Sequence, residues 1–314
     1  MSGWLHSHWP TAGPLAARID HLWWVLVAIT TAVFIAVVVA LVFAVRSGRE
    51  GRGRTIPSTS IVRNISVAVA ITVVVLFGVL IASASTGRAI TGYHSNDPVA
   101  IEVTGHQWWW EIQYVTNPPS DRVTTANEIH IPTNRAIHIQ LRSDDVIHSF
   151  WVPNLQGKID LIPGRTNNIW LQADRPGTYY GPCAEFCGTQ HAHMALVVVA
   201  EPAADFDKWF SAQHASAPPP STDETMRGLA VVEQGPCGLC HTIRGTSAGA
   251  SSAPDLTHIA SRLTLAAGTL PNNRDNLTRW LAHTQQIKPG SKMPNSGLSS
   301  EELPAVVEYL ETLR

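Results

Sequence analysis

The sequence predicts three parts in order: a hairpin of two transmembrane helices, an all-β domain and an all-α domain. Two uncharged apolar runs lie near the amino terminus, at 22–45 and 65–84. Short alternating runs rich in valine, isoleucine and tryptophan follow, and helical periodicity returns after a proline-rich stretch. We therefore place the boundaries at 1–96 for the amino-terminal segment with its helices, 97–201 for the β domain, 202–222 for the linker and 223–314 for the α domain.

The composition bounds the function classes. A chain of 314 residues leaves room for about two domains besides a membrane part. A net charge of -2 gives no overall electrostatic case for nucleic-acid binding.

Each apolar run is long enough to cross a hydrocarbon core of about 30 Å. The segment between the runs should stay in the cytoplasm because it is rich in arginine, with both chain ends on the outer side. Its charged residues are Arg46, Arg49, Arg52, Arg54 and Arg63 against the single Glu50. A cleaved signal peptide is the alternative for the first run, although signal-peptide cores usually have only about 7–15 apolar residues.

The β domain is predicted from period-2 runs separated by proline and glycine turns. Val99 to Glu111 is expected to form one strand, which would put Trp108 and Trp110 on one face and Trp109 on the other. Similar runs suggest a small sandwich or barrel. They are 128–132, 136–141, 168–171 and 195–199.

A cluster of metal-ligand side chains precedes the last of these runs. It contains Cys183, Cys187, His191 and Met194, and His148 on an upstream strand is the nearest further ligand. Soft sulfur and imidazole donors favour copper, and the methionine argues against zinc, which does not use thioether ligands. A simple Cys183–Cys187 disulfide remains the other alternative.

The α domain carries Cys237-Gly-Leu-Cys240-His241, a C-x-x-C-H motif of the kind that attaches haem c. The two cysteines would bond the haem and His241 would be one axial ligand. Met293 is the choice for the second axial ligand because it is the one downstream, loop-borne methionine. A thioredoxin-like redox pair is the alternative, but it would need a βαβ context.

The pattern C-x-E-x-C-x3-H-x2-M, with Asp-Asp-Val-Ile-His148-Ser-Phe upstream, resembles the dinuclear CuA site of cytochrome c oxidase subunit II. The resemblance implies a cupredoxin-like fold and two coppers bridged by the sulfurs of Cys183 and Cys187. The terminal ligands would be His148 and His191. Met194 and the backbone carbonyl of Glu185 would be weak axial ligands, and His193 would not be a ligand.

The same resemblance assigns further roles. Gly105-His-Gln-Trp108 matches the aromatic stretch of that family, so Trp108 would be the exposed tryptophan where electrons enter the copper site; core packing is the alternative. Asp144 and Asp145 would help to dock a positively charged cytochrome. The Glu185 side chain would help to bind Mg²⁺ at the contact with the catalytic subunit.

The α domain resembles a class I cytochrome c, in which the Pro254 carbonyl would orient His241. The whole chain thus resembles subunit II of a caa3-type oxidase, an electron-transfer subunit with haem c and CuA. The catalytic O2 site and proton pumping would belong to another subunit. The family's glutamate near the second helix is missing here, which leaves proton uptake to the partner subunit or to Glu50.

The implied partners are oxidase subunits I and III, with a cytochrome c or a bc1-type complex as external donor. The implied location is the bacterial inner membrane, with both domains on the periplasmic side. Three rival functions were weighed: a quinol-oxidase subunit that has lost copper, a membrane-tethered copper carrier or assembly protein, and a nitrous-oxide-reductase-like copper domain. The complete ligand set argues against the first, and the haem motif argues against the second. The third would need a second large catalytic domain in the same chain, and the sequence shows none.

Overall fold

The computed structural model describes residues 10–49 and 58–314. Leu15–Tyr93 form one compact unit, and His94–Arg314 belong to a second. Glu50, Arg52 and Arg54 lie outside the described residues, and with them the hypothesis that Glu50 admits protons.

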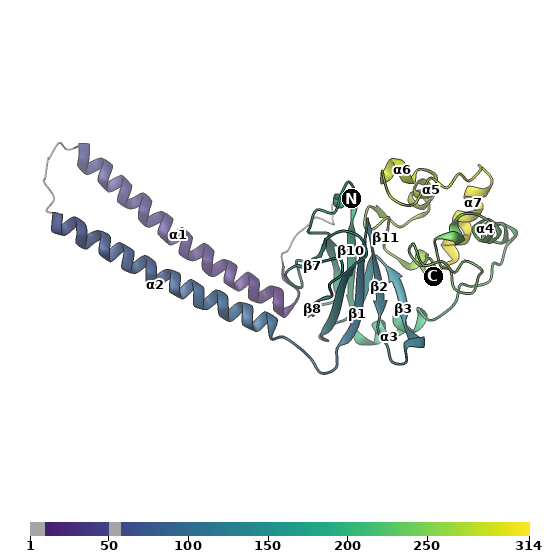
Figure 1. Ribbon diagram of the computed structural model, residues 1–314, viewed down its shortest axis with the longest axis horizontal. Helices are drawn as coiled ribbons and strands as arrows, with labels where there is room; N and C mark the ends of the chain where they lie inside the picture. Colours follow the sequence, from purple (N-terminus) through teal and green to yellow (C-terminus); the bar gives the residue numbers. More distant parts are fainter. Residues whose placement is uncertain (1–9, 50–57) are drawn as a thin grey trace. The chain divides into compact units, whose positions relative to one another are not determined.

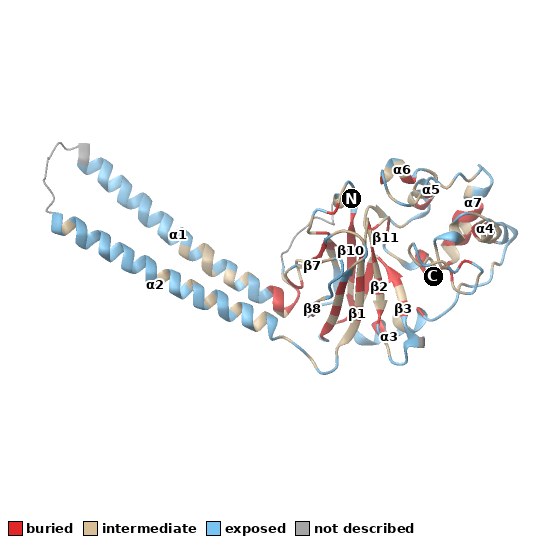
Figure 2. Cartoon of the chain, in the orientation of Figure 1, coloured by how far each residue is buried: buried red, intermediate tan, exposed pale blue. Residues whose placement is uncertain are grey.

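The two predicted apolar runs form the long helices α1 (Pro14–Arg49) and α2 (Ser58–Thr91) (Figure 1). Both helices are long and apolar enough to cross a membrane, and most of their apolar side chains are exposed (Figure 2). Because α1 ends with Arg46 and Arg49 and α2 begins near Arg63, positive charge flanks the apolar stretches at the ends that the connecting segment joins.

The β domain is a two-sheet sandwich. One sheet has the order β3-β2-β1-β5-β8 and the other β4-β10-β9, with a small β6-β7 pair beside them. Alternate side chains of both sheets point inward and form one continuous apolar core, as the period-2 pattern predicted. The strands are β1 (Val99–His106), β2 (Trp109–Tyr114), β3 (Val123–Ala126), β4 (Glu128–Pro132), β5 (Ile137–Ser143), β6 (His148–Phe150), β7 (Ile159–Leu161), β8 (Asn167–Leu171), β9 (Gly177–Pro182) and β10 (Ala195–Glu201).

The prediction of one strand from Val99 to Glu111 was wrong. The chain turns at Gln107 and Trp108, and β2 returns antiparallel to β1. The turn is held by polar contacts, since the Gln107 amide donates to Asp145 Oδ2 at 2.6 Å and its side chain donates to the Cys187 carbonyl at 2.8 Å. Trp108 therefore lies at the tip of a hairpin, beside residues 183–194, which we call the copper loop.

Part of the predicted linker belongs to the β domain. Helix α3 (Ala203–Ala212) buries Phe206 in the sandwich core and packs Trp209 and Phe210 against Tyr114. We call the sandwich with α3 the copper domain. The following segment is tied to the α domain, because Arg244 donates to the carbonyls of Gln213 and Ala215 at 2.5 and 3.3 Å.

The α domain, called the haem domain below, is built on the crossing of its first and last helices. A side chain at Gly228 of α4 (Asp223–Gln234) would overlap the Ala305 carbonyl of α7 (Glu302–Thr312) at 2.1 Å, so the two backbones touch. Both helices contribute to a separate apolar core. Its other strands and α-helices are β11 (Thr264–Leu265), β12 (Leu270–Pro271), α5 (Arg274–Ala282) and α6 (Thr284–Ile287).

Candidate metal centre and haem-attachment site

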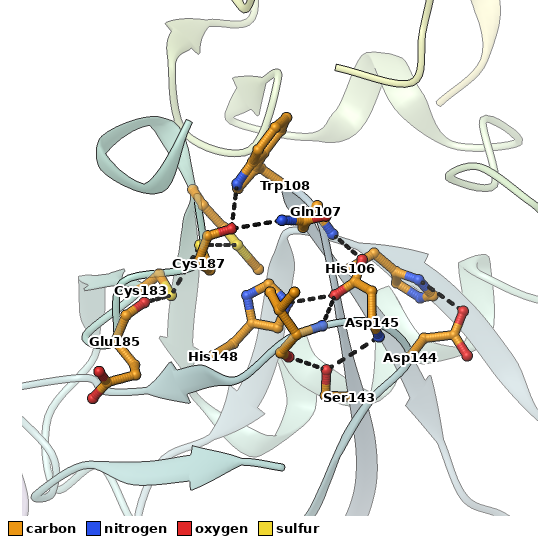
Figure 3. Close-up of polar contacts among 12 residues, drawn as sticks. His106, Gln107, Trp108, Ser143, Asp144, Asp145, His148, Cys183, Glu185 and Cys187 are labelled. Carbon is orange, nitrogen blue, oxygen red and sulfur yellow. Dashed lines mark hydrogen bonds and ion pairs between the residues drawn. The ribbon is translucent and has the colours of Figure 1, made fainter. Parts of the chain in front are cut away.

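His148 begins β6 and is fully buried. Its Nε2 lies 2.8 Å from Asp145 Oδ1, whereas its Nδ1 has no hydrogen-bond partner among the described residues (Figure 3). Burial acts to lower the pKa of His148, but contacts with Cys183 and Asp145 outweigh it and raise that pKa. A buried imidazole nitrogen without a partner, facing two thiols, is suited to hold a metal ion.

The Asp145 carboxylate is hydrogen-bonded within the copper domain, to His148 among other groups. It also accepts the backbone N–H groups of Gln107 and Val146 at 2.6 and 2.7 Å. Burial acts to raise the pKa of Asp145, and these hydrogen bonds outweigh it and lower the pKa. The prediction that Asp145 docks a cytochrome therefore does not fit the structure, while Asp144 is exposed.

Cys183 and Cys187 are both buried, and their sulfurs lie 3.9 Å apart. The two cysteines are therefore not joined as a disulfide in this structure, because an S–S bond is about 2.05 Å long. The contact between the two thiols lowers the pKa of Cys183 and raises the pKa of Cys187. A bound soft cation would displace the thiol protons, because metal ligands of this kind bind as thiolates.

The other predicted donors surround these sulfurs. His191 Nδ1 lies 3.6 Å and Met194 Sδ 3.8 Å from Cys187 Sγ, and the Glu185 carbonyl lies 3.3 Å from Cys183 Sγ. Gly188 allows the loop to turn with φ +113°, a conformation that side chains disfavour. Two thiols, two imidazoles, a thioether and a carbonyl therefore converge, and this donor set fits copper.

His193 is turned away from the sulfurs. Its Nδ1 lies 2.8 Å from the Gln190 side-chain oxygen, as expected for a histidine that is not a ligand. The Glu185 carboxylate also points away from the sulfurs and lies 3.5 Å from Lys158 Nζ (Figure 3).

The haem-attachment residues lie after α4. Cys237 and Cys240 are unpaired, and His241 Nδ1 lies 2.7 Å from the Pro254 carbonyl, which leaves Nε2 free to bind iron. Burial lowers the pKa of His241, and the hydrogen bond to Pro254 opposes this only in part, so the neutral ligand form is favoured. Met293 is partly buried against the same core.

Comparison with known proteins identifies both domains. Residues 117–201 match the family described as cytochrome C oxidase subunit II, periplasmic domain, and residues 225–314 match the cytochrome c family. The chain is 36% identical over 248 residues to cytochrome c oxidase subunit 2 of Alkalihalophilus pseudofirmus, which covers 77% of this chain and 70% of that protein. This chain belongs to the cytochrome c oxidase subunit II family. It carries a cytochrome c domain and transfers electrons to the oxidase, and the family assignment implies CuA and haem c.

Two further relatives match over a smaller part of this chain. Cytochrome c oxidase subunit 2 of Bacillus sp. strain PS3 is 32% identical over 227 residues, and the match spans 69% of this chain and 62% of that protein. The crystal structure of the periplasmic domain of subunit II from Bradyrhizobium japonicum is 31% identical, covering 38% of this chain and 96% of that one with a TM-score of 0.36.

The expected exposure of Trp108 in this subunit II was wrong. The residue is 9% exposed, and its indole Nε1 donates to the Cys187 carbonyl at 3.0 Å. The cytochrome c domain covers the ring, since a side chain at Gly290 would contact its outer edge at 3.8 Å.

Sequence reasoning also missed the roles of Gln107 and Asp145. Gln107 stands in the aromatic motif, and Asp145 stands three residues before His148, the proposed ligand. That spacing was the available signal, because a ligand histidine usually donates its second nitrogen to a carboxylate or carbonyl nearby.

Proposed function

We propose that this subunit accepts electrons on its haem domain, passes them to its copper domain, and delivers them to a haem-copper catalytic subunit that reduces O2 and pumps protons. When bound, haem c and the dinuclear copper centre supply one-electron carriers. The observation that supports this order is the contact of Trp108 with both domains, through the Cys187 carbonyl on one side and the loop at Gly290 on the other. Met293, the proposed iron ligand, follows three residues after Gly290.

The protein groups have distinct tasks in this proposal. Cys183, Cys187, His148 and His191 would hold the two coppers as the strong ligands, and Met194 and the Glu185 carbonyl would be weak ligands. Asp145 holds the His148 ring so that Nδ1 faces the sulfurs. In the haem domain, Cys237 and Cys240 would bond the haem, and His241, oriented by Pro254, and Met293 would be the iron ligands.

We place the subunit in a bacterial inner membrane, with both soluble domains on the periplasmic side. The candidate membrane helices and the arginines at the ends flanking the connecting segment support this orientation. Subunits I and III would be its partners in the membrane, and a cytochrome c or a bc1-type complex would supply electrons.

A further part of the proposal is that the Glu185 side chain contributes to a Mg²⁺ site completed by the catalytic subunit. Its carboxylate is 44% exposed and points away from the copper donors, so it is accessible to a second chain. Carboxylate oxygens suit this hard cation. Mn²⁺ substitution in the assembled oxidase tests this point, because Glu185→Gln should alter the EPR signal of the bound Mn²⁺.

Metal analysis and spectroscopy of the purified full-length protein test the main proposal. We expect two coppers and one covalent haem per chain, with His148→Ala lowering the copper content and leaving the haem content unchanged. Zinc in place of copper, or haem extractable by acid acetone, would contradict the assignment. Purification without an oxidase partner would favour the membrane-tethered carrier instead.

A further inference from the structure

A buried lysine joins the two soluble domains. Lys288 of the haem domain is 3% exposed, and its Nζ donates to three backbone carbonyls. The acceptors are Trp108 at 2.7 Å, His193 at 2.6 Å and Ala266 at 2.9 Å. Trp108 and His193 belong to the copper domain and Ala266 to the haem domain, so one amine ties both together.

The three acceptors match the three N–H donors of an ammonium group. Burying a charge is costly unless hydrogen bonds replace its water, so this arrangement needs all three carbonyls. Burial lowers the pKa of Lys288 to about 7, and the nearby Cys187 acts in the opposite direction. A lysine that served only solubility would lie in water, as the nearby Lys292 does.

Other contacts between the domains surround this lysine. Gln190 Nε2 donates to the Pro289 carbonyl at 2.8 Å, and the Ala195 amide donates to the Ala267 carbonyl at 2.9 Å. Farther along the interface, Glu128 accepts the Leu263 amide at 2.8 Å. Most of these partners are backbone groups, which hold one relative position more strictly than mobile surface charges would.

On both sides of this contact, the residues involved lie close in sequence to proposed cofactor ligands. Lys288 precedes Met293 by five residues, and His193 stands between His191 and Met194. Trp108, the third neighbour, contacts the Cys187 carbonyl. The amine thus sits where the methionine-bearing loop of the haem domain meets the copper loop.

We propose that Lys288 is a positioning residue for electron transfer between the two domains. It fixes the haem domain on the copper loop and keeps the loop before Met293 against Trp108. A soluble cytochrome then cannot reach the surface around Trp108. An external donor must then reduce the haem domain. This inference rests on the proposed function, because it specifies how the two carriers are held together.

The test uses the full-length, cofactor-loaded protein with Lys288→Met, which keeps a side chain of similar length and removes all three donors. Hydroxyl-radical footprinting measures the reactivity of the Trp108 ring, which we expect to rise. Lys292→Met is the matched control, because Lys292 is exposed in the same loop, and it should leave Trp108 protected.

The second readout is the rate at which copper is reduced by pre-reduced haem. We expect Lys288→Met to slow it by about 10- to 100-fold, since small displacements of reacting groups have effects of this order. The copper EPR and haem optical spectra should stay unchanged. Excess reduced soluble cytochrome c should reduce copper directly in the variant and not in the parent protein.

Unchanged Trp108 reactivity together with an unchanged transfer rate would overturn the proposal. If Lys288→Met disturbs either spectrum, Lys288→Gln becomes the deciding variant, because it keeps two N–H donors. Its Trp108 reactivity should lie between those of the parent and of Lys288→Met, with normal copper and haem spectra. Footprinting needs neither cofactor, so a protein that bound no copper would contradict the proposed function while still reporting whether Lys288 docks the domains.

Discussion

Asp145 is a single side chain on which the geometry of the copper site depends. Three hydrogen bonds fix its carboxylate, and one of them orients His148. Replacing Asp145 with asparagine keeps the shape and removes the charge. We expect copper affinity to fall by about 10- to 100-fold, the usual cost of losing a partner that orients a metal ligand.

Competition with a copper chelator measures this affinity. Asp144→Asn is the matched control, because Asp144 is the adjacent carboxylate and its side chain is 72% exposed. Equal copper retention by both variants would mean that Asp145 does not position His148.

Residue types and spacing predicted which donor side chains lie together, but not their orientation. Cys183, Cys187, His191 and Met194 could be predicted because they fall in one loop with soft donors at short intervals. Asp145 was misread because a sequence shows a charge without showing where it points. Trp108 was placed on an exposed face because its burial depends on a loop 180 residues away in the chain.

The crossing of α4 and α7 is the element-scale feature that holds the haem domain together. Gly228→Ala would bring a methyl group to 2.1 Å from the Ala305 carbonyl, and the helices would have to separate. We expect a loss of about 1–3 kcal/mol in the unfolding free energy of this domain, the typical cost of overpacking. The higher helix propensity of alanine acts in the opposite direction and offsets roughly 1 kcal/mol of this overpacking cost.

Denaturant unfolding followed at the haem absorbance provides the measurement. Gly249→Ala serves as the control, since a side chain there would meet nothing within 4 Å. A Gly228 variant as stable as this control would show that the helices have room to move apart.

The elements themselves were predicted unevenly. Periodicity found the strands and the last helix, because each buries one regular face. Helix α3 was taken as linker, since its aromatic residues are explained only by their contacts with the ring of Tyr114, which the sequence does not show. The hairpin at Gln107 was missed because polar contacts to another loop make the turn, without the usual glycine or proline signal.

At the scale of the two soluble domains together, His130 makes the folding stability depend on pH. Its ring lies 3.0 Å from Glu128 and 2.9 Å from Glu201, and Glu128 also accepts the Leu263 amide of the haem domain. Burial acts to lower the pKa of His130, but the two carboxylates outweigh it and raise the pKa above 6.5. A raised pKa gives stability that is fully present below about pH 6.5 and is lost as pH rises through the folded-state value.

We therefore expect the thermal midpoint of the parent protein to fall between pH 6 and pH 8 by more than that of His130→Gln. Thermal unfolding of both proteins at the two pH values checks this difference, and titrations common to both cancel in the comparison. His138→Gln is the control, because His138 contacts Trp170 on another strand of the same domain. It should keep the pH dependence of the parent; parallel curves for parent and His130→Gln would rule out the role of His130.

The attachment of the linker to Arg244 has a hydrodynamic consequence. A domain that swings on a free tether must push solvent aside, and its transfer rate would fall as the solvent becomes more viscous. Here the segment after α3 is held at Gln213 and Ala215, and the Ala217 amide donates back to the Arg244 carbonyl at 2.8 Å. Transfer from haem to copper should therefore run at the same rate in buffer and in concentrated sucrose, and stopped-flow measurements across that series would reveal any swinging step as a slope.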